Sequence, residues 1–309
     1  MHAPAVPALA RHALAVCGLT VCALVVCATA AAAQGSTVNE RADSLVEPSS
    51  ASSRSLVHTR ELRSQGPLRI AERNPLYQLF LTPMVSGADV LSWGESRILM
   101  SNAYSNIFEY NQSPQLRQLF DVERLQTTVV LSYGIAPRFE LGLHVAVQHD
   151  WGGFLDPLIQ GVHTTFGFPN ADREKVDNND YRLHLESGYD PVRTYLDLPS
   201  GTAVESPRIV LAWQVAGGPE QRHALALRTT YKAPVGTARA TRHRADAAVE
   251  VALRRSTERT HLHLSAGAVT INAPARLDAL MRGHAWLASL ALERSITPGF
   301  SLLAQFSGG

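Results

Sequence analysis

The chain has 309 residues, of which 45% are hydrophobic and 18% charged, and its 28 basic residues nearly balance its 27 acidic ones. A net charge of +1 excludes a polybasic nucleic-acid-binding protein, since phosphate binding needs an excess of lysine and arginine. The hydrophobic content is too high for a disordered chain.

The first 33 residues have the features of a secretory signal peptide. Two basic residues, Arg11 and His12, precede an apolar run over 13–28, and small residues lead to Ala33. The run is shorter than the roughly 20 residues of a spanning helix. A valine precedes each cysteine, which argues against a lipid anchor. We therefore predict a cleaved signal at 1–33 and export across the inner membrane.

All three cysteines lie inside this signal, at Cys17, Cys22 and Cys27. Thiol catalysis, iron–sulfur clusters and cysteine zinc sites are therefore excluded from the mature protein. Residues 34–66 are rich in serine, arginine and glutamate, and this composition predicts a flexible polar lead-in.

From residue 67 onward the dominant pattern is an alternation of apolar and polar residues, which is typical of β-strands. In the clearest case, 138–150, Leu141 and Leu143 lie on one face and Glu140 and His144 on the other. Residues 124–133 alternate in the same way, and the turn chemistry at 134–137 predicts a hairpin. Further strands are predicted near 96–110, 208–215, 222–232, 246–254, 260–265, 286–293 and 300–306.

The connections between these strands alternate in length. Short turns are expected at 134–137, 217–221, 255–258 and 295–299. Longer polar stretches are expected at 111–123, 151–205, 233–245 and 272–283. This arrangement is typical of an outer-membrane barrel, whereas a soluble sandwich has no reason to sort its loops by length. We therefore predict an all-β fold, an antiparallel transmembrane β-barrel of about 10–12 strands over 67–309, with a loop and helix insert at 151–204.

The predicted strands are odd in number, whereas bacterial barrels usually have an even number. The sequence ends at Gly308-Gly309 directly after a strand. We therefore expect that C-terminal strands are missing from this chain, the alternative being that this is the true end.

One segment breaks the strand pattern, because apolar residues recur at spacings of three and four over 152–167. This spacing predicts a short amphipathic helix in the first long loop or in the barrel mouth. The candidate mouth or ligand residues are Asp150, Gly152, Gly153, Phe154, Asp156, His163, Phe166 and Arg173.

A metal site in this segment would draw on His149, Asp150, Asp156, His163 and Asp172. Asp156 and His163 are seven residues apart, whereas metal-binding pairs on a helix are three or four apart. We therefore favour a plug or rim helix whose apolar face packs on the barrel wall, and we expect no metal or other cofactor.

Two other groups of residues have chemical potential. His261 and His263 face the same way along one strand and, with His144, are candidates for a metal site in the lumen, although solvated lumen histidines are more common. Three serines, together with these histidines, supply the residue types of a lipid-hydrolysing site, but no Gly-x-Ser-x-Gly motif is present and the sequence does not tell whether they lie together. These serines are Ser132, Ser265 and Ser289.

The segment Gly152-Gly153-Phe154-Leu155-Asp156, with His163, Phe166-Gly167 and residues 169–173, resembles an uncharacterised bacterial family, a domain of unknown function. The residues Arg73-Asn74-Pro75-Leu76 resemble the start of its conserved region. The resemblance extends from Leu68 to the C-terminus. It implies a barrel-forming protein of bacteria that have an outer membrane, and it implies no activity.

The sequence thus predicts an outer-membrane barrel that passes or binds a small solute or supports the envelope, with the short helix narrowing its mouth. Enzymatic activity is left open and not expected. The alternatives are a barrel enzyme acting on envelope lipids and a soluble periplasmic β-sandwich carrier. The expected partners are the lipid bilayer and an unidentified small solute, with no nucleic acid. A basic loop is a candidate for contact with lipopolysaccharide phosphates, through Arg239, Arg242, His243 and Arg244.

Overall fold

The computed structural model describes residues 64, 66–69, 73–187, 194–238, 244–272, 282–297 and 300–309. The predicted signal peptide, most of the predicted lead-in, and Arg239, Arg242 and His243 of the basic loop lie outside the described residues.

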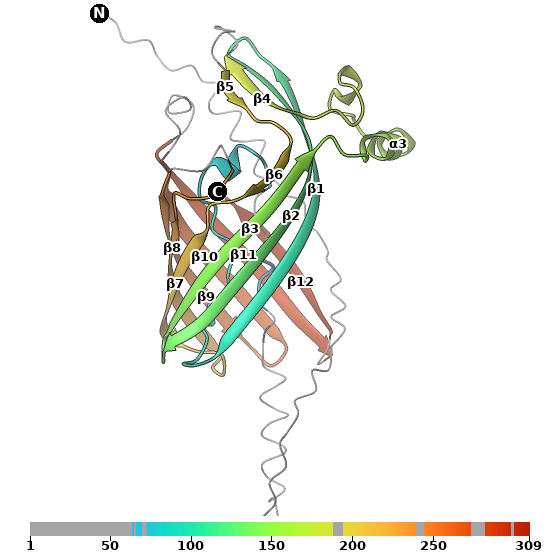
Figure 1. The fold of residues 1–309 in the computed structure, drawn as a ribbon. Helices are drawn as coiled ribbons and strands as arrows, with labels where there is room; N and C mark the ends of the chain where they lie inside the picture. Colours follow the sequence, from blue (N-terminus) through green and yellow to red (C-terminus); the bar gives the residue numbers. More distant parts are fainter. Residues whose placement is uncertain are drawn as a thin grey trace, which may run out of the picture.

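A single antiparallel sheet makes up the fold (Figure 1). Its twelve described strands are β1 (Ser96–Gln112), β2 (Leu116–Ala136), β3 (Phe139–Trp151), β4 (Arg182–Ser187), β5 (Thr194–Asp197), β6 (Gly201–Val204), β7 (Arg208–Gly217), β8 (His223–Lys232), β9 (Asp246–Ser256), β10 (Thr260–Thr270), β11 (His284–Thr297) and β12 (Phe300–Gly308). The strand order is β12-β11-β10-β9-β8-β7-β3-β2-β4-β5, with β1 also paired to β2 and β6 to β3. The prediction of an all-β antiparallel fold with one short α-helix is confirmed.

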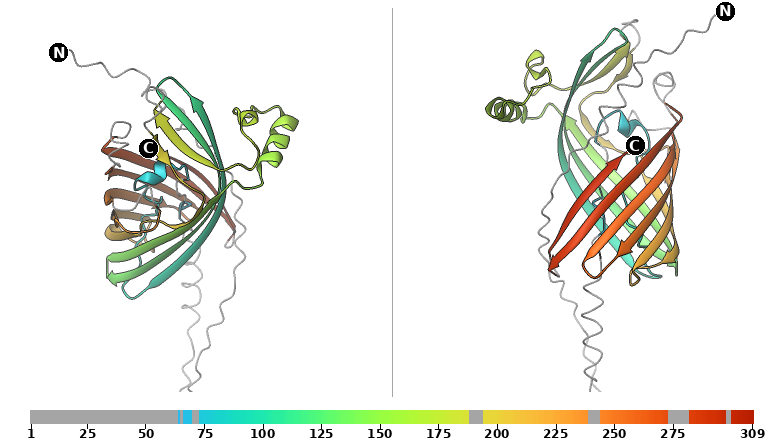
Figure 2. Two further views of the ribbon diagram at one scale, coloured as in Figure 1. Left: turned by 45° about the horizontal axis from the view of Figure 1, so that its top comes forward. Right: turned by 180° about the vertical axis from the view of Figure 1, so that it is seen from behind.

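The sheet curls around a central space, but it is not closed in the part of the chain that the structure describes. β1 pairs only with β2, and β12 pairs only with β11, so two free edges remain (Figure 2). Strand direction gives a physical reason. The long strands alternate in direction from β1 to β12, and they are odd in number, so β1 and β12 run the same way. Antiparallel hydrogen bonding cannot join two such strands.

The first hairpin is longer than predicted, and the expected loop at 111–123 is wrong. β2 already begins at Leu116, and only three residues separate it from β1. The apolar–polar alternation is missing there because both faces of β2 are buried. Phe120 and Val122 pack in an apolar cluster on the inner face, while Asp121 and Glu123 lie on the outer face beneath a loop.

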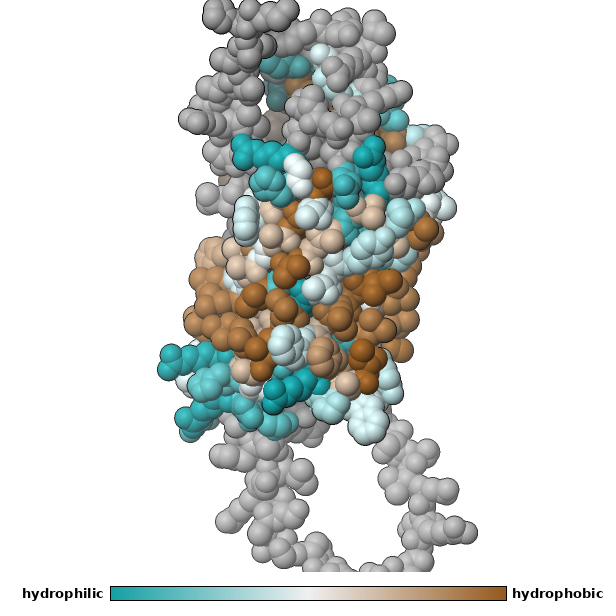
Figure 3. Space-filling model, turned by 90° about the vertical axis from the view of Figure 1, so that its left-hand side faces the viewer, coloured by the Kyte–Doolittle hydropathy of each residue, from teal (hydrophilic) through white to brown (hydrophobic). Residues whose placement is uncertain are grey.

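The two faces of the sheet differ in polarity as the alternation predicts, with polar side chains inside and apolar side chains outside. Buried inward-facing residues include Arg124, Gln126, Glu140, Gln214, Arg228, Lys232, Asp246, Arg254, His261, His263 and Glu293. Exposed outward-facing residues include Ile98, Met100, Leu131, Leu141, Leu211, Trp213, Tyr231, Val249, Val251, Leu264, Trp286 and Leu292. On the face shown in Figure 3, the apolar side chains form a band with hydrophilic residues above and below it.

The space inside the sheet is occupied by the chain segment that precedes β1. This inner segment, residues 73–92, includes the 3-10 helix η1 (Tyr77–Leu79) at the open end of the sheet (Figure 1). Leu79, Leu81 and Val90 are buried there in three separate apolar clusters. In the cluster of Val90, Ala88 and Val90 pack against small residues of the sheet wall, namely Ala212, Ala224, Ala226 and Ala252.

The connection between β3 and β7 contains the helix α3 (Asp156–Phe166), the 3-10 helix η2 (Arg173–Lys175) and the short strands β4, β5 and β6. α3 lies outside the curled sheet, beside the upper part of β1 and β2 (Figures 1 and 2). None of the described helices is long and apolar enough to cross a membrane.

Candidate functional site

Charged side chains on the inner wall bind the backbone of the inner segment. Arg208 donates to the carbonyl of Thr82 at 3.1 Å, and Arg228 donates to the carbonyl of Asp89 at 3.3 Å. The buried N–H and C=O groups of an irregular segment need such partners, because they make no hydrogen bonds within a helix or sheet. The inward-facing charges therefore hold the inner segment.

Backbone amides of the inner segment are satisfied in the same way by acceptors on the wall. Leu81 N–H donates to Asp246 at 2.9 Å, Val90 N–H to Gln214 at 3.1 Å and Leu91 N–H to Glu140 at 2.9 Å. These three acceptors come from β9, β7 and β3, so the segment is held from several sides.

Buried ion pairs complete the inner wall. Arg124 forms a two-point contact with Asp150, at 2.6 and 2.7 Å, and Lys232 pairs with Asp246. Each of these side chains is less than a tenth exposed. Removal of one partner would leave an uncompensated buried charge.

A cavity of about 220 Å³ opens at the loop end of the sheet, beneath η1. Apolar side chains line one part of it, and polar or paired charged groups line the rest. Its wall includes Leu79, Phe80, Leu183, Leu198, Gln78, Arg124, Gln148, Asp150, Ser200, Thr202, Ala203, Glu205, Arg208 and Lys232. The cavity is smaller than the roughly 300–1,000 Å³ of drug-sized ligand sites, so it suits a small solute. Two further cavities inside the sheet measure only about 20 and 10 Å³.

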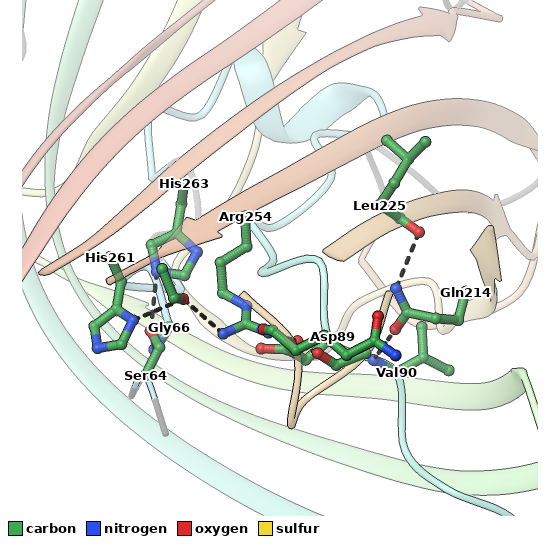
Figure 4. A network of polar contacts seen from close by, with 12 residues as sticks. Ser64, Gly66, Asp89, Val90, Gln214, Leu225, Arg254, His261 and His263 are labelled. Carbon is green, nitrogen blue, oxygen red and sulfur yellow. Dashed lines mark hydrogen bonds and ion pairs between the residues drawn. The ribbon is translucent and has the colours of Figure 1, made fainter. Parts of the chain in front are cut away.

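A second polar network lies at the opposite, turn end of the interior (Figure 4). Arg254 contacts Asp89 at 3.0 Å and also donates to Ser256 at 2.7 Å, and Ser256 contacts His261 at 2.8 Å. This network ties the inner segment to β9 and β10.

Beside this network the Ser64 hydroxyl lies 2.9 Å from Nε2 of His263 and donates to Glu293 at 2.5 Å. In a nucleophile–base–acid triad the acid binds the other ring nitrogen of the histidine. Here Glu293 lies on the Nε2 side, at 3.8 Å, and Nδ1 of His263 is buried without a hydrogen-bond partner among the residues that the structure describes. The arrangement therefore lacks the geometry of a catalytic triad.

The predicted lumen histidines do not come together. His261 and His263 share the inner face of β10, but His144 lies on β3 in a different cavity, near Arg69 and Arg208. Among the described residues no group of three or more histidine, aspartate or glutamate side chains could hold a metal ion.

None of the three serines considered as nucleophiles has a hydrogen bond to a histidine among the interactions of the described residues. Ser265 and Ser289 hydrogen-bond each other through their hydroxyls at 2.7 Å. Ser132 lies on β2, and it lines the same small cavity as His144. Their placement gives no support to a hydrolase site.

The predicted mouth residues divide between two places. Asp150 lines the cavity, paired with Arg124. The other seven lie on the loop outside the sheet, which we call the outer loop, residues 152–181. The expectation that α3 narrows the mouth is wrong, because η1 and the inner segment occupy the mouth and α3 lies outside it.

Two predicted residues of the outer loop form its anchor. Arg173 and Asp156 pair at 2.6 Å, both nearly fully buried, and the Arg173 guanidinium lies 4.4 Å above the ring of Phe108 on β1. Asp156 also accepts from the backbone N–H of Asn179 at 2.8 Å. This buried pair fixes the loop on the outer face of the first hairpin.

The Gly152-Gly153 pair allows the loop to approach β2 closely. Gly153 has φ +78°, and a Cβ there would lie 1.8 Å from the carboxyl carbon of Glu123. Glu123 accepts from the backbone N–H groups of Phe154, at 2.8 Å, and Leu155. A side chain at either glycine would displace the loop, since a Cβ at Gly152 would lie 2.1 Å from the carbonyl of Asn179.

The remaining predicted residues face away from the sheet or pack within the loop. The His163 ring packs edge-on against Phe168, with ring centroids 6.1 Å apart, and Phe166 is 69% exposed. Asp121 lies beneath the loop; burial, and next the charge of Asp156, raise its pKa to about 7 against the opposing effect of Arg173.

A family model described as a protein of unknown function, DUF3187, matches residues 53–308. Among curated proteins, none matches the chain.

Proposed function

We propose, from the premise that the chain belongs to the DUF3187 family of proteins of unknown function, that it is an outer-membrane barrel protein that binds a small solute at its mouth. Its interior is filled by its own inner segment, so binding is favoured over passage. The proposed solute is small, with one apolar edge and polar groups of no strong net charge.

The observation that carries the membrane location is the inverted polarity of the sheet. Outward-facing Ile98, Met100 and Trp286 are 75%, 63% and 71% exposed, whereas inward-facing Arg124 and Arg254 are 2% and 1% exposed. Exposure of large apolar side chains to water is unfavourable by about 25 cal/mol per Å². The same arrangement is favourable when lipid covers the outer face. A soluble sandwich would bury these apolar faces, so this observation argues against the carrier alternative.

The filled interior argues against an open pore. Leu79, Leu81, Ala88 and Val90 are all at most 5% exposed, and they lie at successive depths along the interior. The 220 Å³ cavity lies at the loop end, whereas two other cavities inside the sheet measure only about 20 and 10 Å³.

The neutral character of the proposed solute follows from the charges that line the cavity. Arg124, Arg208 and Lys232 are each paired with an acid, so none offers an uncompensated charge. An enzyme acting on envelope lipids would need a nucleophile–base–acid triad, and the Ser64–His263–Glu293 group lacks that geometry because Glu293 lies on the Nε2 side of the ring.

The first test is the location and shape of the protein. Isolated outer membranes should contain it, and its gel mobility should differ between boiled and unboiled samples. In planar bilayers the purified protein should give no conductance above background. A soluble periplasmic protein of unchanged mobility would refute the membrane location, and a steady conductance would refute the filled interior.

The second test addresses the cavity. A panel of small neutral and zwitterionic solutes should include one that raises the temperature at which unboiled mobility is lost, since ligands stabilise the state they bind. Ala203→Trp fills the cavity and should abolish this shift, whereas Ala247→Trp, at an exposed position of β9, should preserve it. A shift that survives Ala203→Trp would place the binding elsewhere.

A further inference from the structure

α3 exposes an apolar stripe that no described residue covers. Leu158, Val162 and Phe166 recur every four residues on one side of the helix and are 62%, 42% and 69% exposed. Phe154 and Phe168, just outside the two ends of the helix, add rings that are 66% and 58% exposed. A helix of a soluble protein normally turns such a stripe toward the core.

The outer loop is fixed with this stripe turned away from the sheet. Asp156, at the first position of α3, is 2% exposed and pairs with Arg173. On the same loop, Arg173 also donates to Asn106 of β1. The polar side of α3 therefore faces the protein, the reverse of the packing predicted from the sequence. The outward orientation of the stripe is fixed by the structure, since the buried ion pair of Asp156 and Arg173 holds α3 in this orientation.

The stripe continues the outward apolar band of the sheet. Met100 and Tyr104 lie on the outer face of β1, and the Tyr104 ring is 5.5 Å from the ring of Trp151 and 6.0 Å from that of Phe154. Phe154 leads directly into α3. An aromatic contact thus joins the end of the band to the start of the helix, where membrane barrels place aromatic residues at the lipid–water boundary.

We propose that α3 lies in the lipid–water interface, with Leu158, Val162 and Phe166 inserted among the upper acyl chains. The loop is then a second membrane contact, separate from the strands. Amphipathic helices bind membranes in this way, with the apolar face buried about 5–10 Å below the headgroup boundary. This inference rests on the proposed membrane location of the sheet.

Site-directed labelling tests the contact. All three native cysteines lie in the predicted cleaved signal, so the mature protein needs no cysteine replacement, and one new cysteine carries a polarity-sensitive nitrobenzoxadiazole label. Val162→Cys places the label on the stripe, and Thr164→Cys is the matched control on a different side of the same helix, also exposed. Met100→Cys reports on the outward face of the sheet.

The labelled proteins are reconstituted in dioleoylphosphatidylcholine vesicles with and without lipid spin-labelled near the headgroup. We expect the emission of the Val162 label to shift to the blue and to be quenched by the spin-labelled lipid, since an interfacial helix inserts its apolar face to the depth of the spin label. The Thr164 label should keep its emission in both vesicles. A vesicle series with the spin label deeper in the chain should quench Met100 and leave Val162 less affected.

The outcomes separate the two proposals. Quenching at Met100 without quenching at Val162 overturns the inference and leaves the membrane location standing. Absence of quenching at both positions overturns the membrane location, and the inference with it. A blue-shifted Val162 label that lipid does not quench, and whose shift grows with the protein-to-lipid ratio, also overturns the inference, because a second copy then covers α3.

Discussion

Two irregular segments pack on the same sheet, and one buries its apolar side chains whereas the other exposes them. The inner segment buries Leu79 and Leu81 at 4% and 0% exposure, whereas the outer loop exposes Leu158 and Phe166 at 62% and 69%. Both segments contact the sheet through polar groups, by backbone hydrogen bonds inside and by the Asp156–Arg173 pair outside. The difference is the one expected if the sheet separates a filled, protein-like interior from the lipid of the proposed membrane location.

The largest expected effect is on the buried charges that hold the inner segment. Asp246→Ala removes the partner of Lys232 and the acceptor of Leu81 N–H. We expect the free energy of unfolding to fall by about 3–5 kcal/mol, because a buried charge is left uncompensated. The measurement is urea unfolding in detergent micelles followed by tryptophan fluorescence.

Two variants control this experiment. Asp197→Ala, at a side chain that is 72% exposed, should leave the unfolding midpoint unchanged. Joint replacement of Lys232 by Met and Asp246 by Leu should restore part of the stability. Equal losses of stability in Asp246→Ala and Asp197→Ala would show that the buried Lys232–Asp246 pair stabilises the protein no more than an exposed carboxylate does.

A comparison of leucines separates the two segments directly. Leu81→Ala should cost about 2–5 kcal/mol, as expected for a leucine buried in a core. Leu158→Ala, in the exposed stripe of α3, should change the stability in micelles by less than about 0.5 kcal/mol. Similar costs at both positions would contradict the contrast between a filled interior and an exposed stripe.

Overpacking tests whether small wall residues make room for the inner segment. Ala226 is fully buried against Ala88 and Val90. Ala226→Leu should cost about 1–3 kcal/mol. Its matched control, Ala247→Leu, lies at an exposed position of β9 and should be neutral. If both variants are neutral, the inner segment does not need those alanines.

The smallest expected effect is a pH dependence confined to the outer loop. The pKa of Asp121 is about 7 in the folded protein, whereas its ordinary value, which applies to the unfolded chain, is 3.8. The folded state therefore binds the proton more tightly than the unfolded state. The stability of the loop should therefore be greatest below about pH 4 and should fall as the pH rises toward 7.

Amide hydrogen exchange of the outer loop, corrected for intrinsic rates, measures this dependence. Asp121→Asn should make the protection independent of pH between 5 and 8. Asp172→Asn, at an exposed carboxylate of the same loop, should retain the dependence. Protection that rises with pH in the unmodified protein would reverse the sign and contradict the assigned pKa.

The apolar–polar alternation predicted a strand correctly where one face of the strand is in a polar environment and the other face is in an apolar one. The alternation over 138–150 predicts β3 within one or two residues, because its inward Glu140 and outward Leu141 meet different surroundings. It failed over 116–123, where a cluster covers one face of β2 and the outer loop covers the other. Alternation disappears when both faces are buried, even though the strand is regular.

The inner segment was missed because its contacts are distant in sequence. Val90 pairs with Gln214, 124 residues away, and nothing in the local pattern indicates this. The available signal was the run of inward-facing alanines on β7 to β9, which leaves space that some other part of the chain must fill. The Asp156–Arg173 anchor was similarly missed, since its partners are 17 residues apart in an irregular loop.

The position of the inner segment has a consequence for the order of folding. It precedes β1 in the chain and is surrounded by strands that follow it, so it is synthesised before the walls that enclose it. Glu140, Gln214 and Asp246 each accept a hydrogen bond from a backbone N–H of the segment once it is in place. We expect early placement of the segment to give each later strand a surface to fold against, so that the N-terminal part of the chain acts as a template for assembly of the sheet.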